Sequence, residues 1–368
     1  MREGLYLRPT GLIAGDLAGR LVAEKAALWL AGGPLAFTGA MLVEGKPGAT
    51  QTRYLDAAGL FQSADPDLRP LIDRVTAARG EFAGLSLARP LLMGIVNVTP
   101  DSFSDGGAFA GPDDAVAHGW ALIEAGADIL DIGGESTRPG SEAVPLSVER
   151  ERVMPVLAAL AGCGVPMSID TRKAALMAEA TGLGAEIIND ISALTYDPES
   201  AAIAAASNAH VVLMHCKGEP RTMQQAPRYR DVVLEVYDAL AERLAAAEAA
   251  GIPRARLAVD PGIGFGKSFA HNLEIMEHLA LFHGLGVTLL VGASRKGFVG
   301  HVTGVASAGA RVHGSVGMAL AAAGQGAQIQ RVHDVAATRQ ALTAWRSARG
   351  IETDGAPAVR PVRVAHKI

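Results

Sequence analysis

Hydrophobic residues in the second and longer part of the chain form short runs that alternate with amphipathic segments. The runs are rich in Val, Ile and Leu, and they are too short and too β-branched to be helices. Eight of them follow one another, at residues 91–97, 128–133, 165–170, 185–190, 210–215, 256–260, 288–294 and 328–334. This pattern predicts eight strands.

The segments between these runs repeat their apolar positions with a helical period of about 3.6 residues. Clear examples are residues 113–126, 147–162, 229–251 and 335–350. Gly251 is expected to end one of these helices, and Asp197-Pro198 to cap and begin another. Strands that are apolar on both faces must be covered on both faces, so the pattern predicts an α/β fold, a (β/α)₈ TIM barrel. A doubly wound open sheet is the structural alternative.

Residues 1–88 do not follow this alternation. Their Gly-rich and acidic mixture predicts a small N-terminal α/β extension of unknown role, with a helix over residues 67–80. The apolar stretch 27–43 is interrupted by Gly32, Gly33 and Pro34, which favours buried structure over a membrane span. We therefore expect three parts, which are the extension 1–88, a barrel over 89–350 and a C-terminal tail over 351–368.

Composition narrows the class of protein. The chain has 33 basic and 38 acidic residues, a formal net charge of -5, which gives no general attraction to nucleic acid. Its two cysteines, Cys163 and Cys216, allow neither a disulfide framework nor a cysteine-rich zinc site, and we expect two reduced, buried thiols. The first residues lack the apolar core of a secretory signal. These features predict a cytoplasmic enzyme.

Polar residues close nearly every predicted strand. In a TIM barrel the carboxyl ends of the strands share one mouth, where the chemistry lies. The residues expected there are Asn97, Asp131, Asp170, Asn189, Asp190, His215, Asp260, Ser294, Arg295, Lys296, Arg331 and His333. Capping explains a single Asp after a strand, and Asp334 is interpreted as a helix cap. Capping alone does not explain so many.

The types of residue indicate a substrate that combines a base with phosphate. The side chains of Asp170, Asn189 and Asp260 suit a flat heterocycle with N–H donors, because a carboxylate accepts two hydrogen bonds from such an edge. Arg331, His333 and Arg138 suit an anion with several oxygens. Asn97 could serve a Mg²⁺ ion held mainly by substrate phosphate and water.

Two glycine-rich motifs do not match common nucleotide or hydrolase motifs. Residues 260–268 (DPGIGFGKS) fail the P-loop spacing and the dinucleotide GxGxxG spacing, and we interpret them as a tight turn with Phe265 beside a flat ligand. Residues 292–297 (GASRKG) are not the GxSxG of a hydrolase. His215 and Cys216 point to opposite faces of a strand, so we expect a structural histidine and no metal site.

The motifs MGIVNVTPDSFSDGG, DIGGESTRPG, SID, IINDI, LMH, DPGIGFGK, VGASRKGF and QRVHD occur in this order, one for each strand. The set resembles the dihydropteroate synthase family over about residues 90–350. The resemblance implies condensation of 6-hydroxymethyl-7,8-dihydropterin diphosphate with 4-aminobenzoate to 7,8-dihydropteroate and diphosphate, in folate biosynthesis. It also implies Mg²⁺ and a homodimer.

The same resemblance implies roles for individual residues. Asp170, Asn189, Asp260 and Lys296 would form the pterin pocket, with Met214 and Phe265 as its apolar walls. Asn97, Arg331 and His333 would hold the diphosphate and Mg²⁺. Thr137 and Arg138 would lie on the second loop of the mouth, and Asp105 on the first loop would approach the pterin cation. The catalytic set would be Asp105, Arg138 and Lys296.

Two departures from the family pattern leave alternatives. Gly297 stands where a serine is common and helps to form the aminobenzoate carboxylate site, and His215-Cys216-Lys217-Gly218 replaces the usual His-Met-Gln-Gly. One alternative is a pterin-dependent methyltransferase, which would be expected to lack the Thr137-Arg138 loop and the phosphate clamp. The other is a non-catalytic pterin-binding relative, which would not need Asp105.

Overall fold

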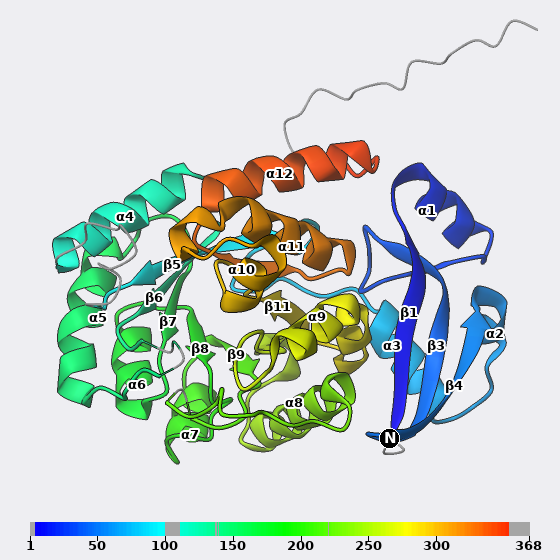
Figure 1. Cartoon of the computed structure of the whole chain (residues 1–368), viewed down its shortest axis with the longest axis horizontal. Helices are drawn as coiled ribbons and strands as arrows, with labels where there is room; N and C mark the ends of the chain where they lie inside the picture. The colour runs from blue at the N-terminus through cyan, green and yellow to red at the C-terminus, as the bar shows by residue number, and fades with distance from the viewer. Residues whose placement is uncertain (1–3, 100–110, 137, 139, 220, 353–368) are drawn as a thin grey trace, which may run out of the picture.

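The computed structural model describes residues 4–99, 111–136, 138, 140–219 and 221–352 (Figure 1). In this part of the chain, a closed barrel lies beside a smaller antiparallel sheet. The barrel strands are β5 (Leu91–Asn97), β6 (Ile129–Gly133), β7 (Met167–Asp170), β8 (Ile187–Asp190), β9 (His210–Met214), β10 (Leu257–Asp260), β11 (Thr288–Val291) and β12 (Ile329–Val332). All eight predicted strands are therefore present.

The strands close in the order β10-β11-β12-β5-β6-β7-β8-β9, and every neighbouring pair is parallel. Nearly all their residues are buried, as expected for strands covered on both faces. Closure confirms the TIM barrel and excludes the open sheet.

Helices follow the barrel strands and form its outer layer (Figure 1). They are α4 (Pro112–Glu124), α5 (Leu146–Leu160), α6 (Ala174–Gly182), α7 (Ser200–Ala206), α8 (Val232–Ala249), α9 (Phe269–Glu277), α10 (Gly297–Thr303), α11 (Val312–Gly324) and α12 (Val335–Ala348). Short 3₁₀ turns are η2 (Arg254–Arg256), η3 (Leu279–Leu285) and η4 (Ala308–Ala310). Gly251 follows α8 with a φ of 96°, so its predicted role at the end of that helix is confirmed.

The two predicted helix caps have different outcomes. The Asp197 carboxylate accepts a hydrogen bond of 3.0 Å from the backbone N–H of Glu199, directly before α7, and another of 3.0 Å from the backbone N–H of Ala174 at the start of α6. Asp334 occupies the N-cap position of α12 without a side-chain capping bond, and its carboxylate pairs with Arg295 at 2.5 Å. The predicted capping bond of Asp334 is therefore wrong, because a partner from another element competes with the local N–H groups and a local sequence pattern does not contain that partner.

The N-terminal segment forms a four-stranded sheet with its own apolar core. Its elements are β1 (Leu5–Ile13), α1 (Gly15–Ala23), β2 (Leu28–Trp29), β3 (Ala36–Lys46), β4 (Ala49–Asp56), α2 (Ala57–Gln62) and α3 (Leu68–Thr76). The stretch 27–43 lies mainly in β2 and β3 and is largely buried, as predicted. No helix in the described part of the chain is long and apolar enough to cross a membrane.

Helix α3 ends before the predicted limit at residue 80, because Arg79 is used elsewhere. The Arg79 guanidinium donates to the carbonyl oxygens of Val287 and His283, both at 3.1 Å, and of Arg74 at 2.9 Å. These bonds tie the chain leaving α3 to the outer layer of the barrel. A helix continued through Arg79 would lose them.

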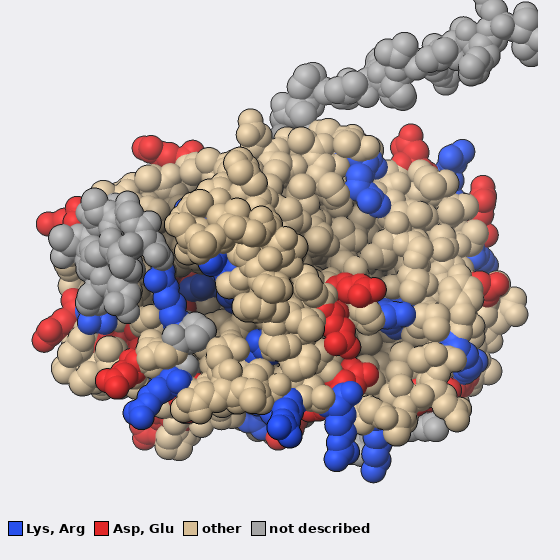
Figure 2. Space-filling model, in the orientation of Figure 1, with Lys and Arg blue, Asp and Glu red and all other residues tan. Residues whose placement is uncertain are grey.

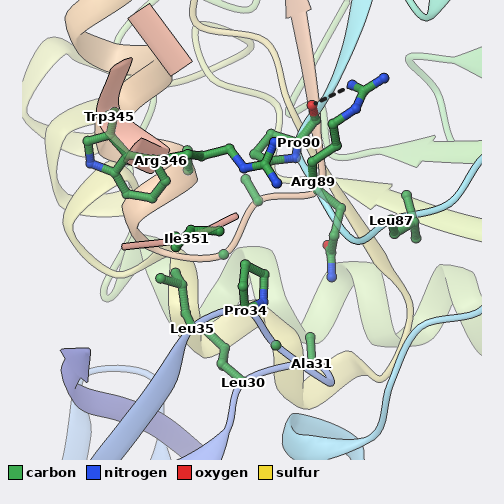
Figure 3. A pocket seen from close by; sticks show the side chains of 15 residues that line it. Leu30, Ala31, Pro34, Leu35, Leu87, Arg89, Pro90, Trp345, Arg346 and Ile351 are labelled. Atoms are coloured by element: carbon green, nitrogen blue, oxygen red, sulfur yellow. Dashed lines mark hydrogen bonds between the residues drawn. The ribbon is translucent and has the colours of Figure 1, made fainter. Parts of the chain in front are cut away.

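The N-terminal sheet packs closely against the side of the barrel. The Tyr6 hydroxyl lies 2.9 and 2.8 Å from the two carboxylate oxygens of Asp238 on α8, and the Tyr6 ring meets Tyr237 edge to face. Figure 3 shows a small gap where Pro34 and Leu35 approach Trp345 of α12. Its volume of about 30 Å³ has room for little more than water, which is consistent with close packing.

The bottom of the barrel is closed by the segment that connects the sheet to β5. Phe82 is fully buried there, among residues at the starts of the strands that include Leu91, Ile129 and Ile187. The backbone N–H of Ala83 donates to His210 Nε2 at 3.2 Å. An apolar plug therefore fills the end of the barrel opposite to the mouth.

Candidate active site

The parallel strands bring the predicted polar residues to one mouth. Asp170 and Asn189 are paired neighbours in the β7–β8 register, and Asp170 also stands opposite Gly133 of β6. Asn97, Asp260 and Arg331 lie at or near the carboxyl ends of β5, β10 and β12. Figure 2 shows Lys and Arg side chains in a recess on this face of the molecule. The shared mouth predicted from the sequence is therefore present.

Arg331 is the centre of a buried network of charges. Its Nε donates to Asp131 Oδ2 at 2.5 Å, and its Nη2 donates to Asp170 Oδ2 at 2.8 Å. The same Asp131 oxygen accepts from Asn189 Nδ2 at 3.1 Å. Arg331 thus joins residues from four strands, β6, β7, β8 and β12.

Burial perturbs the charges in this network. Burial raises the pKa of Asp170, and Asp131 adds to the rise, although Arg331 opposes it. Burial would lower the pKa of Arg331, but the carboxylates of Asp131 and Asp170 outweigh it and raise that pKa. A single guanidinium therefore serves two acids in a site with little water. Such arrangements are common where a charged ligand binds.

Asp260 adds another acid on the opposite side of the barrel. Burial raises its pKa, while Lys296 and a hydrogen bond from the Gly262 N–H, at 2.7 Å, act against the rise. Met214, at the end of the adjacent β9, is buried with 4% of its surface exposed. The mouth therefore contains acids on both sides and an apolar wall between them.

Lys296 stands at the entrance to this acidic pocket. Lys296 follows β11 and occupies the N-cap position of α10. Its Nζ donates a hydrogen bond to the carbonyl oxygen of Ile263. The ammonium also lies 4.7 Å from the centre of the Phe265 ring. Burial lowers the pKa of Lys296 to about 8, although Asp260 favours the charged form. The lysine remains mainly charged at neutral pH.

His333 and Arg138 belong to the same electrostatic group. His333 Nδ1 lies 3.0 Å from the Ser294 hydroxyl, and its backbone N–H also donates to that oxygen at 3.2 Å. Burial, together with the nearby cations Arg295, Arg331, Arg138 and Lys296, lowers the pKa of His333 to about 3. The imidazole is therefore neutral. Arg138 is near enough to influence it, while its own side chain is exposed.

Asn97 fits the role of a single oxygen ligand to a hard cation. It ends β5 and is partly buried, and no other described residue hydrogen-bonds to its side chain. Within the described ranges, no group of three or more His, Cys, Asp or Glu residues could hold a metal ion. A Mg²⁺ ion here would take most of its ligands from substrate and water, as this ion commonly does.

Two predicted residues lie outside the described part of the chain, Asp105 in the first loop and Thr137 in the second. The two cysteines are free, as predicted, and their side chains are partly buried where burial was expected. Burial raises the pKa of the Cys216 thiol to about 11, which makes it a poor nucleophile at neutral pH.

Gly297 leaves the rim open. Its φ is not in the left-handed region, and a Cβ placed there would meet only Phe269 within 4 Å, at an ordinary contact distance of 3.8 Å. The backbone therefore does not require glycine at this position. A serine would fit without strain.

A second cluster of ions was missed from the sequence. Glu135, which follows β6, pairs with both Arg172 and Lys173, and Lys173 also pairs with the fully buried Glu149. Arg172 continues to Glu219 in the loop after β9, at 2.9 Å. The cluster fixes the base of the loop that carries Arg138. Glu135 is part of the DIGGESTRPG motif, but nothing in its spacing identifies partners that follow other strands.

Comparisons with known proteins match the barrel part of the chain. The sequence profile of the family described as "Pterin binding enzyme" matches residues 93–333. A dihydropteroate synthase of Neisseria meningitidis serogroup C is 49% identical over 266 residues, which cover 72% of this chain and 94% of that protein.

Solved structures give the same result. A Xanthomonas albilineans dihydropteroate synthase with 4-aminobenzoic acid has a TM-score of 0.69 and 50% identity, covering 73% of this chain and 97% of that one. The Xanthomonas albilineans enzyme in complex with 7,8-dihydropteroate has a TM-score of 0.66 and 48% identity, with the same coverage. Strands β1–β4 lie outside the range that the family profile matches.

Proposed function

The chain belongs to the pterin-binding enzymes as a dihydropteroate synthase, and on this premise we propose how the residues of its mouth share the work of the reaction. The enzyme condenses 6-hydroxymethyl-7,8-dihydropterin diphosphate with 4-aminobenzoate, in folate biosynthesis. The C–O bond to diphosphate breaks, a C–N bond to the amine forms, and the amine loses one proton. This transferase activity is therefore preferred to the two alternatives, a pterin-dependent methyltransferase and a non-catalytic pterin-binding relative.

The pterin binds to the acidic side of the mouth. Asp170, Asn189 and Asp260 accept or donate hydrogen bonds along the polar edge of the ring, and Met214 and Phe265 cover its faces. The supporting observation is the buried network in which Arg331 joins Asp131 and Asp170. When the diphosphate draws the guanidinium toward itself, Asp170 becomes available to the ring. The acids then stabilise the positive charge that develops on the pterin.

The diphosphate binds to the cationic side. Arg331 and the neutral His333 hold its oxygens, with Asn97 as the protein ligand to Mg²⁺. When bound, Mg²⁺ neutralises charge on the leaving diphosphate. The support for this assignment is the set of donors near β5 and β12 together with the Asn97 side chain, to which no described residue hydrogen-bonds.

Arg138 contributes positive charge near His333. The roles that the family resemblance implies for Thr137 and Asp105 fall outside the described residues. Lys296 lies between the pterin and the aminobenzoate. Excluding water matters because the cation that forms at the pterin methylene is open to hydrolysis.

A purified-protein assay with pterin diphosphate, Mg²⁺ and labelled 4-aminobenzoate tests these assignments. We expect labelled dihydropteroate from the wild type, and a large but measurable fall in its rate of formation in Lys296→Ala and in Arg331→Ala. Omission of Mg²⁺ should abolish product. Full turnover by either variant would contradict its role, and full turnover in a chelator would contradict the metal site.

We also propose that the enzyme is a homodimer. Three large apolar side chains are exposed on adjacent helices, Phe269 (48%) and Leu273 (39%) of α9 and Val302 (51%) of α10. A second copy of the chain would bury them. Sedimentation analysis should give twice the mass of the chain, and Leu273→Glu should shift it toward the monomer. A wild-type monomer at micromolar concentration would contradict the proposal.

The two free cysteines support a cytoplasmic location, because a reducing compartment keeps thiols unpaired. Cell fractionation should find the enzyme with cytoplasmic markers. Recovery with secreted or membrane fractions would contradict this.

A further inference from the structure

Lys267 is a buried cation for which the reaction described above has no use. Only 1% of its surface is exposed, and it is among the largest fully buried side chains. Its ammonium contacts the loop 261–266, which follows β10, and His215, which follows β9. That loop carries the Phe265 ring and the Ile263 carbonyl to which Lys296 donates.

The ammonium of Lys267 gathers acceptors from two segments. It donates to the carbonyl oxygens of Gly262 at 2.9 Å and Phe265 at 3.0 Å, both in the loop. It also lies 2.9 Å from His215 Nδ1 and 3.4 Å from the His215 carbonyl, at the end of β9. Because an ammonium has three protons, these four acceptors satisfy it completely.

The ring of His215 accepts from Lys267 and does not compete with it. Burial and the positive charge of Lys267 lower the pKa of His215 to about 2, so the ring is neutral. Burial lowers the pKa of Lys267 to about 7, with Lys296 and Lys217 acting in the same direction and Cys216 and Asp260 against it. A buried ammonium without a paired carboxylate is retained at a cost in stability. The cost suggests a role in the site.

The loop backbone is pressed against the end of β9. Gly262 has a φ of 68°, and a Cβ there would stand 1.9 Å from the His215 carbonyl oxygen. The loop and the end of β9 are therefore in close contact at Gly262. Lys267 donates to carbonyl oxygens of both segments at this approach, while Lys296 contacts the Ile263 carbonyl and the Phe265 ring of the same loop.

We propose that Lys267 is a positioning residue for the synthase reaction, which holds the Ile263 carbonyl and the Phe265 ring where they orient Lys296. The inference rests on the proposed role of Lys296. Lys267 itself touches neither substrate. Its loss lets the loop move away from β9, and the Lys296 ammonium moves with it.

A double-mutant cycle tests this role. Lys267→Met keeps the length of the side chain and removes the donors, and we expect kcat/KM to fall by about 10-fold or more, since a misplacement of about 1 Å can cost 100-fold. In a Lys296→Ala background the same substitution should cost less than about twofold, because the group that it orients is already gone. A purely structural role predicts the same factor in both backgrounds.

Lys217→Met is the matched control. Its side chain is 46% exposed, on the outer side of the same region, with Nζ 2.7 Å from the Arg228 carbonyl. It should leave kcat/KM unchanged. Equal losses in Lys267→Met with and without Lys296 would overturn the inference, as would wild-type activity in Lys267→Met. Wild-type activity in Lys296→Ala alone would instead overturn the role proposed for Lys296.

If Lys267→Met does not fold, His215→Leu carries the same test. This change removes one acceptor and keeps the ammonium and its backbone contacts. We expect a loss of about threefold in kcat/KM that disappears in the Lys296→Ala background. A loss that persists in that background, or no loss, would overturn the inference.

Discussion

The two ends of the barrel use the same residue types for opposite purposes. At the bottom, Asp128 is held by Arg89 at 2.7 Å, by Arg339 and by the Leu92 N–H, also at 2.7 Å. Burial alone would raise the pKa of Asp128, but these partners outweigh it and lower that pKa. At the mouth, Asp170 has a raised pKa and shares Arg331 with Asp131.

The difference lies in how completely each acid is satisfied by the protein. Asp128 receives two arginines and a backbone N–H, so it is fully ionised and stabilises the fold. The mouth provides one arginine for two acids, and Asp131 Oδ1 is buried without a partner among the described residues. That deficit is what a substrate with N–H donors could fill. The fully paired acid at the bottom therefore stabilises the fold, and the incompletely paired acids at the mouth are available to a ligand.

The largest expected effect comes from removing the arginine at each end. Arg331→Ala should lower kcat/KM on the order of 10³-fold, equivalent to about 4 kcal/mol, since it removes charge stabilisation and leaves two buried acids unpaired. Steady-state kinetics measures this. Arg89→Ala is the matched control at the bottom, and it should lower the free energy of unfolding while leaving kcat/KM within about twofold. Equal kinetic losses would remove the contrast between the ends.

Phe82→Ala tests the bottom from its apolar side. The substitution leaves a cavity where the plug meets Leu91 and Ile129, and the free energy of unfolding should fall by about 3 kcal/mol. Urea unfolding measures this, with kcat/KM at low temperature as the second measurement. The kinetic constants of the folded variant should stay near those of the wild type. A loss of activity without a loss of stability would contradict the assignment of this end to stability.

Asp128→Asn tests whether the stabilisation at the bottom of the barrel depends on the ionisation of Asp128. The pKa of Asp128 is lowered by folding, so its stabilisation is present above the unfolded pKa of about 3.9 and is lost as pH falls through the folded value. At pH 7 the variant should be less stable than the wild type by about 2 kcal/mol, a value kept low because the site is partly solvated. The unfolding midpoints of the wild type and of Asp128→Asn should approach each other as the pH is lowered to 3. A constant difference across that range would contradict the ionic origin.

The smallest effect is expected at the rim. Gly297→Ser restores a hydroxyl near Phe269 without strain, and it should change the KM for 4-aminobenzoate by about threefold while the KM for pterin diphosphate stays constant. Initial-rate kinetics with each substrate varied in turn measures both constants. An equal change in the two would refute the placement of Gly297 beside the aminobenzoate.

Many residues of the mouth could be predicted from the sequence, because the carboxyl ends of all strands in a TIM barrel meet at one mouth. Once the apolar runs identify parallel barrel strands, the residue that closes each run must face the mouth, as Asn97, Asp170 and Asp260 do. What could not be predicted was pairing between strands. Asp334 was interpreted as a cap because Arg295, its partner, belongs to another loop.

The same limit explains two other omissions. Lys267 ends the DPGIGFGK motif, and its role depends on the His215 carbonyl and ring at the end of a different strand. In the sequence, Phe82 is an ordinary apolar residue in a linker. Its role in filling the bottom of the barrel is evident only once the barrel is closed. Periodicity predicts elements, whereas these contacts join residues that are distant in sequence.

Carboxyl ¹³C NMR of the substrate-free enzyme tests most directly whether the two ends differ, with signals assigned by Asp128→Asn and Asp170→Asn. We predict that Asp128 titrates below the ordinary Asp pKa of about 3.9 and that the signal lost in Asp170→Asn titrates well above it. If both signals titrate together at or below about 3.9, the mouth holds its acids as the bottom does, and the account is contradicted.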